Sequence, residues 1–215
     1  MNYKDILADI KDKKTSPIYF LVGEEPYYID KLCNEFSNKL IKKEERDFNQ
    51  VVFYGKDTNI EEIILECKQF PFGAEKRLVI IKEAQSLKNI ELLDSYFDKP
   101  QLTTVLVIAY KKKSIDKRKK FGKNLNKKTI VFESSKIYDN QISTWILNYL
   151  DEKEFKIENN AIAILTEHIG ANLSKIANEL EKLMLVVPKN KKISNQDIEL
   201  HIGISKDFNI FELQN

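Results

Sequence analysis

Residues 18–41 constrain the fold of this chain most. They begin with a short apolar run of strand type, residues 18–22, which Gly23 ends. Pro26 suits the first turn of a helix, where a missing N–H costs nothing. Apolar residues then repeat at helical spacing and form one stripe: Ile29, Leu32, Cys33, Phe36 and Leu40. A strand, a glycine turn and a helix form the unit that opens a phosphate-binding α/β domain.

The residues of that unit that would bind a phosphate are missing. A P-loop, GxxxxGK followed by Ser or Thr, offers free backbone N–H groups, a lysine for the phosphates and a hydroxyl for magnesium. The turn at residues 23–26 reads GEEP, so two carboxylates lie where an anion would bind and a proline removes one donor. A second nucleotide motif, an apolar strand ending in Asp-Glu, is changed as well, because Lys82 stands in the metal position. The sequence therefore predicts a nucleotide-type scaffold with no nucleotide or other cofactor and no ATP hydrolysis.

Strands and helices alternate over residues 1–137, the first predicted domain. Further strands are expected at 48–54, 78–81, 103–109 and 129–132, and the almost wholly apolar stretch 103–109 is expected in the centre of a sheet. Thr58 and Glu61 form a capping box that starts a helix, and another helix is expected over 89–97. This alternation indicates an α/β fold, a mainly parallel sheet with helices on both faces, and leaves the strand order open.

Beyond residue 137 the strand pattern disappears, and residues 138–215 are predicted to form a small all-helical domain. Helix starts are indicated by Asn159 or Asn160, by Asn172, and by Ser194 with Asp197. The chain ends on four large apolar residues within 208–213, which need cover. We therefore expect it to be part of a longer protein.

Composition and the rarer residue types exclude several classes. The chain has 215 residues, of which 42% are hydrophobic and 32% charged, and no apolar run approaches the ~20 residues of a membrane span. The N-terminus lacks the apolar core of a signal peptide. Cys33 and Cys67 are expected to be reduced core thiols, so the predicted compartment is the cytoplasm, with no membrane contact. His168 and His201 have no triad partners and are expected to be partly buried structural residues, so we predict no catalytic or metal site.

An unusual aromatic segment, here termed the plug loop, comprises Phe70, Pro71, Phe72 and Gly73. Pro71 forces Phe70 out of helical geometry, and Gly73 allows a sharp reversal. Two phenylalanines two residues apart on an extended segment point to opposite sides, so one core cannot readily bury both. One interpretation is that one or both fold back under the sheet edge; the other is an aromatic plug that enters a pocket on a partner.

Basic residues are concentrated in one run, residues 111–128. It has ten basic side chains against one acid, Asp116, a net charge of +9, whereas the whole chain carries +2 and the remainder therefore −7. Either this run is a solvated face, or it contacts nucleic-acid phosphates. Phe121 is the only aromatic residue in it, so base reading is not implied. The candidates for phosphate contact are Lys111, Lys112, Lys113, Lys117, Arg118, Lys119 and Lys120.

In order and spacing, several segments of this chain resemble the delta subunit of the bacterial DNA polymerase III clamp loader. The matching pieces are PIYFLVGEEPYYIDKL, FPFGAEKRLVIIKEA, SIDKRKKFGKNL, GANLSKIANELEKL and NIFEL. The resemblance covers essentially the whole chain. It implies an AAA+-like module of the P-loop NTPase type that has lost ATP binding, then a helical lid domain. The family adds a third, collar domain, which we expect to be missing from this chain.

The resemblance also implies a function and a site. The hydrophobic pair with which the family binds its clamp falls on Pro71 and Phe72, with Phe70 and Gly73 adjoining, and either phenylalanine could be the main plug. Such a subunit binds and opens the ring-shaped sliding clamp (beta) during DNA replication. Its other partners would be clamp-loader subunits, met through the collar domain, and primed DNA. It has no active site of its own, because nucleotidyl transfer belongs to another subunit of the polymerase III holoenzyme.

Two alternatives stay open from the residues themselves. One is a general DNA-binding protein that uses the basic run of residues 111–128. The other is a nucleotide-binding enzyme with an atypical site.

Overall fold

The structure of the chain is a computed structural model that describes residues 1–111, 115–116 and 118–203. It divides into two compact units, Met1–Lys136 and Ile137–Asn215. The elements of the first unit are α1 (Tyr3–Asp12), β1 (Ile18–Gly23), α2 (Pro26–Lys39), η1 (Lys43–Glu45), α3 (Arg46–Asn49), β2 (Gln50–Tyr54), α4 (Ile60–Lys68), β3 (Arg77–Lys82), η2 (Ala84–Ser86), η3 (Ile90–Leu93), α5 (Asp94–Phe97), β4 (Thr104–Tyr110), α6 (Lys120–Lys128) and β5 (Ile130–Ser134).

Five parallel strands form the sheet of the first unit, in the order β2-β3-β4-β1-β5. The strand that was expected to be central, β4, lies between β3 and β1, which confirms that prediction. Because all strands run the same way, their carboxyl ends meet at one edge of the sheet and their amino ends at the opposite edge. These two edges hold the candidate sites.

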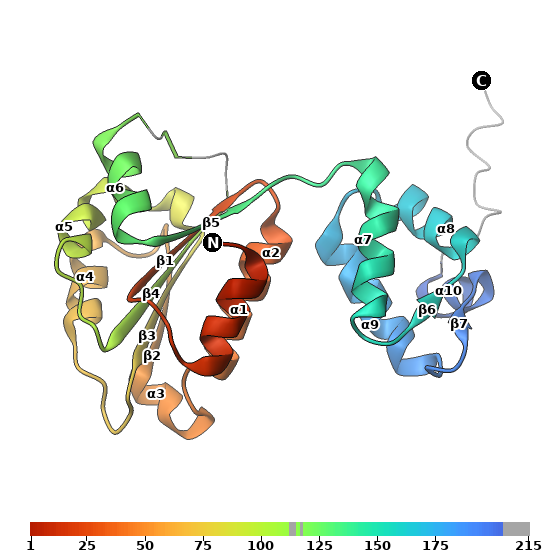
Figure 1. Cartoon of the computed structure of the whole chain (residues 1–215), viewed down its shortest axis with the longest axis horizontal. Coiled ribbons are helices and arrows are strands. Elements are labelled where there is room, and N and C mark those ends of the chain that lie inside the picture. Colours follow the sequence, from red (N-terminus) through yellow and green to blue (C-terminus); the bar gives the residue numbers. More distant parts are fainter. Residues whose placement is uncertain (112–114, 117, 204–215) are drawn as a thin grey trace. The chain divides into compact units, whose positions relative to one another are not determined.

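Helices cover both faces of this sheet, as predicted (Figure 1). Successive strand side chains point to opposite faces, so Tyr19 and Leu21 pack with α1 and α2, whereas Phe20 and Val22 pack with the side that carries α4, α5 and α6. Each strand residue of β1 from Ile18 to Val22 is buried. A strand that is buried on both faces has a continuous run of apolar residues in its sequence. The sequence therefore predicts such a strand well.

Three predictions about local structure in this unit are wrong in detail. The strand expected from residue 48 begins at Gln50, because Phe48 and Asn49 end the short helix α3. Helix α4 is capped by Asn59, whose side chain accepts a hydrogen bond from the Glu62 N–H at 2.9 Å, not by the Thr58 capping box. The helix expected over 89–97 is a 3-10 turn, η3, followed by α5.

The second unit is helical around one small strand pair. Its elements are α7 (Asp139–Asp151), β6 (Lys156–Ile157), α8 (Asn159–Ile169), α9 (Leu173–Val186), β7 (Lys192–Ile193) and α10 (Asn195–Ile202). Asn172 caps α9 and Ser194 with Asp197 caps α10, as predicted. Helix α8 instead starts after Glu158, and the parallel pair β6–β7 was not predicted. The apolar residues within 208–213 lie outside the described residues. No described helix is long and apolar enough to cross a membrane.

Candidate functional site

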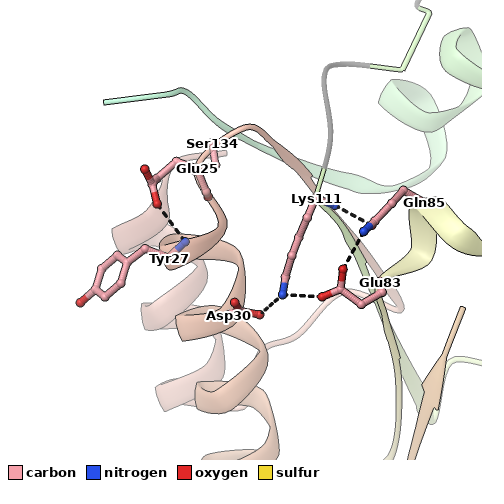
Figure 2. Close-up of polar contacts among 7 residues, drawn as sticks. All are labelled: Glu25, Tyr27, Asp30, Glu83, Gln85, Lys111 and Ser134. Atoms are coloured by element: carbon pink, nitrogen blue, oxygen red, sulfur yellow. Dashed lines mark hydrogen bonds and ion pairs between the residues drawn. The ribbon is translucent and has the colours of Figure 1, made fainter. Parts of the chain in front are cut away.

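At the carboxyl edge of the sheet, two backbone N–H groups of the turn after β1, those of Glu24 and Tyr27, already have acceptors within the chain. The Glu25 carboxylate accepts a hydrogen bond from the Tyr27 N–H at 3.1 Å, at the N-terminus of α2 (Figure 2). The Glu24 N–H donates to the Ser134 carbonyl at 3.1 Å, and the Ser134 hydroxyl donates to the Glu25 carbonyl at 2.8 Å. A helix N-terminus attracts anions, and here a carboxylate of the chain itself already lies there.

Gly23 is required where this turn touches β5. Its φ is +148°, and a Cβ atom at this position would lie 2.0 Å from the Ser134 carbonyl oxygen. Only glycine permits both the conformation and this close approach. The turn is therefore packed against β5.

A second polar group at this edge, here termed the edge cluster, comprises Asp30, Glu83, Gln85 and Lys111 (Figure 2). The Lys111 ammonium lies 2.7 Å from an Asp30 carboxylate oxygen and 2.6 Å from a Glu83 carboxylate oxygen. Gln85 donates to the other Glu83 oxygen at 2.6 Å and accepts from the Lys111 N–H at 3.0 Å. The lysine that follows β4 thus bridges acids from α2 and from the end of β3.

The electrostatics of this edge follow from these contacts. The hydrogen bond from Lys111 lowers the pKa of Glu83. Burial alone would lower the pKa of Lys111, but its hydrogen bonds to Asp30 and Glu83 outweigh burial, and its pKa is raised. Burial raises the pKa of Glu25, opposed by the Tyr27 N–H. The pKa shifts of Glu83 and Lys111 therefore both favour the charged forms. Lys111 places a cation of the chain itself at the same sheet edge as Lys82, the lysine that stands in the metal position of the second nucleotide motif.

The other titratable candidates are dispersed. His168 on α8 and His201 on α10 are exposed, so the expectation of partial burial is wrong. Cys33 and Cys67 are buried free thiols in the core, and burial raises the pKa of each to about 12. Within the described ranges no three His, Cys, Asp or Glu side chains lie together as a metal site.

At the amino edge, the plug loop projects its two aromatic rings into solvent. Helix α4 ends at Lys68, and Gln69 is already extended before Pro71. Phe70 is 76% exposed and Phe72 is 72% exposed, so neither ring folds back under the sheet edge. Gly73 has φ +66°, which provides the reversal into β3.

Sequence reasoning missed a third ring beside this loop. Phe48, 63% exposed at the end of α3, has its ring centroid 5.5 Å from that of Phe72. The expected strand from 48 to 54 concealed it, because period-2 patterning cannot show that a residue before the strand turns toward a loop 24 positions away. The one available signal was an aromatic residue at the first position of the predicted strand.

Buried polar groups fix both of these phenylalanines. The Asn49 side chain accepts from the Phe72 N–H at 2.7 Å and donates to the Phe72 carbonyl at 2.8 Å. Arg77 donates to the Phe48 carbonyl at 2.7 Å and forms an ion pair with Glu66 of α4. Asn49 and Arg77 are both buried.

The residues of the basic run lie in different surroundings in the structure. Lys111 belongs to the edge cluster, with only 19% of its side chain exposed, and Lys112, Lys113 and Lys117 lie outside the described residues. Arg118, Lys119 and Lys120 are exposed, with Arg118 paired to Asp116. Phe121 is buried against Phe20 and Phe97, so its ring is not available for base stacking.

The chain matches a known family over most of the first unit. Residues 19–135, more than half of the chain, match the family model described as DNA polymerase III, delta subunit. The chain belongs to this family. This confirms the resemblance drawn from the sequence motifs.

Relatives of this delta-family chain are similar along almost its full length. It is 27% identical to the DNA polymerase III subunit delta of Bacillus subtilis over 98% of the chain and 64% of that protein. It is 25% identical to the probable subunit delta of Aquifex aeolicus, over 91% of the chain and 57% of that protein. The chain thus spans less than two thirds of the length of these relatives.

Solved structures agree with the delta-family fold. The Bacillus subtilis DNA clamp loader delta protein superposes with a TM-score of 0.76 and 26% identity, over 98% of this chain and 65% of that one. The Thermotoga maritima RuvB Holliday junction branch migration motor superposes with a TM-score of 0.53 and 16% identity, over 94% and 67%, which shows the fold alone. The predicted AAA+-like fold with a helical lid domain is confirmed.

Proposed function

We propose that this delta-family chain binds the ring-shaped sliding clamp of the replicase through its plug loop and favours the open form of the ring. The observation that carries the proposal is the pair of exposed rings, Phe70 and Phe72, on a loop whose backbone is held by a buried side chain. Large aromatic anchors typically contribute about 2 kcal/mol or more when an interface buries them. Binding shifts the clamp toward its open form only to the extent that this surface binds the open form more tightly than the closed form.

The proposed mechanism uses no ATP hydrolysis by this chain. Support comes from the turn after β1. There the Glu25 carboxylate accepts a hydrogen bond from the Tyr27 N–H, and the Ser134 carbonyl accepts one from the Glu24 N–H. A triphosphate would have to displace both contacts and approach two carboxylates. Equilibrium ATP binding tests this part, and micromolar affinity would contradict it.

Phe72→Ala is the main test of the plug. We expect affinity for the cognate sliding clamp to fall at least thirtyfold, about 2 kcal/mol, because a ring that fills a pocket is lost. The Tm should change little, since the ring is exposed in the free protein. Leu200→Ala, an equally exposed apolar residue on α10, is the control and should bind normally. Unchanged affinity of Phe72→Ala would refute the plug.

The remaining partners belong to the same proposal. The other clamp-loader subunits, reached through a collar domain, and primed DNA would complete the assembly, and nucleotidyl transfer would belong to another subunit of the holoenzyme. Contact between the basic run and DNA is a second candidate function, favoured by the exposed lysines Lys119, Lys120, Lys123 and Lys127 on or just before α6.

A further inference from the structure

We infer that Phe48 and Phe72 form one preorganised aromatic pair that enters the sliding clamp together, and that Asn49 is the residue that positions it. This inference rests on the proposed function and extends its site beyond the plug loop. It assigns a contact residue, Phe48, that lies outside the family motif matched by Pro71 and Phe72. It also separates the two phenylalanines of the plug loop, because Phe72 belongs to the pair and Phe70 does not.

The two rings already form a single surface in the free protein. Their centroids are 5.5 Å apart with an angle of 49° between the ring planes, within the range in which aromatic rings attract each other. Both nevertheless remain mostly exposed, Phe48 at 63% and Phe72 at 72%. A pair that contacts itself and still faces water presents one continuous apolar ridge, which suits an apolar pocket on the clamp.

The buried side chain of Asn49 fixes the backbone of Phe72 in this pair. It pairs with both backbone groups of Phe72, at 2.7 and 2.8 Å, and also donates to the Glu45 carbonyl at 2.9 Å. Asn49 has no exposed surface, so these hydrogen bonds do not compete with water. One side chain thereby fixes the loop residue Phe72 to α3, the helix that ends with Phe48 and Asn49.

The Phe48 side of the pair is fixed independently. Arg77, the first residue of β3, donates to the Phe48 carbonyl at 2.7 Å, and its ion pair with Glu66 ties it to α4. The pair is therefore anchored to the amino ends of two strands and to the helix that precedes the plug loop. A surface that is ordered before binding loses less conformational entropy when it binds, which raises its affinity.

Phe70 differs from Phe72 in its surroundings. Among the described residues, no ring stacks on Phe70, and its 76% exposure is the highest of the three. The preorganised ring, Phe72, is thus the main anchor. Phe70→Ala should weaken clamp binding less than Phe72→Ala does.

The experiment measures affinity for the cognate sliding clamp by calorimetry or surface plasmon resonance. Phe48→Ala should weaken binding about tenfold. Tyr54→Ala is its control, because Tyr54 is also an exposed aromatic but lies at the opposite end of β2, and it should bind within twofold of the wild type.

Asn49 is tested through its dependence on Phe72. Asn49→Ala should weaken binding about tenfold in the wild-type chain but less than threefold when Phe72→Ala is already present, because a positioning residue acts only through the ring it positions. The Phe72 amide should also exchange its hydrogen faster in Asn49→Ala. Ile63→Val, a core change chosen to lower the Tm comparably, controls for destabilisation and should leave affinity unchanged.

The outcomes separate this inference from the proposed function. If Phe72→Ala binds normally, the proposed function fails. If Phe72→Ala loses binding while Phe48→Ala or Asn49→Ala behaves like its control, the plug stands and the preorganised pair is overturned. Phe48→Ala removes an exposed ring, so it decides the question even if Asn49→Ala does not fold.

Discussion

The role inferred for Lys111 differs between the sequence and the structure. In the sequence it is the first lysine of a basic run, a candidate for DNA phosphate. In the structure its ammonium bridges Asp30 and Glu83 at 2.7 and 2.6 Å, and it is mostly buried. A lysine with two carboxylate partners is poorly placed to neutralise a phosphate, so the DNA candidates of the described chain begin at Arg118.

The edge cluster predicts a pH dependence of stability. Glu83 has a lowered pKa in the folded state, relative to its ordinary value of 4.5, because Lys111 donates to it. Its contribution to the free energy of unfolding is therefore fully present above about pH 5 and is lost as the pH falls through its folded pKa. Glu83→Gln should be less stable than the wild type at neutral pH, by at most about 1 kcal/mol because 41% of the Glu83 side chain is exposed.

Urea unfolding of both proteins between pH 7 and pH 3 measures this difference. The gap between wild type and Glu83→Gln should narrow as the solution becomes acidic. In a Lys111→Met background the narrowing should become smaller, because the largest cause that lowers the Glu83 pKa is gone and only the Gln85 hydrogen bond and the charge of Lys82 still lower it. A gap that is independent of pH would contradict the role of this ion pair.

At the scale of elements, most helix and strand interiors were predictable, whereas the starts of β2, α4 and α8 were not. The strand interiors are continuous apolar runs, and the helix stripes repeat every three or four residues, so both are local patterns. The start of α4 depended on which of two adjacent polar residues, Thr58 or Asn59, caps the helix. The start of β2 depended on where α3 ends. Neighbouring candidates such as Thr58 and Asn59 differ too little for sequence to choose between them.

The cap of α4 can be tested directly. Asn59→Ala should lower the free energy of unfolding by about 1 kcal/mol, because the Glu62 N–H loses its acceptor at the first turn. Thr58→Ala is the matched control and should cost less than about 0.5 kcal/mol, since its hydroxyl makes only exposed hydrogen bonds, to the Glu62 carboxylate at 2.7 Å and to the Asn59 carbonyl at 3.5 Å. The measurement is the midpoint of urea unfolding at unchanged slope. Equal losses for the two variants would restore the Thr58 capping box.

On the scale of the whole molecule, charge is segregated along the chain. The run of residues 111–128 carries +9 in a chain of +2. Its described part places Lys123 and Lys127 on the exposed face of α6, whereas Phe121 and Leu125 face the core. This helix can therefore meet phosphates without exposing its apolar side.

DNA binding should follow from this face and should be weak and nonspecific. Replacing Lys119, Lys123 and Lys127 together by Gln should reduce duplex affinity and lower the slope of log K against log salt by about 2 to 3. The control replaces three exposed lysines of the second unit, Lys175, Lys191 and Lys192, for the same change in net charge. If both triple variants lose affinity equally, net charge and not this face explains DNA binding.

The sequence by itself determined the alternating strands and helices, the parallel sheet, and the turn chemistry that disfavours phosphate. Those features depend on periodicity and on residue types that lie next to each other. Only the tertiary structure decided that Asn49 holds Phe72 across 23 residues and that Lys111 pairs with Glu83 across 28. Such contacts join elements that are adjacent in the sheet but distant in the chain, and no local pattern specifies which polar side chain meets which backbone group.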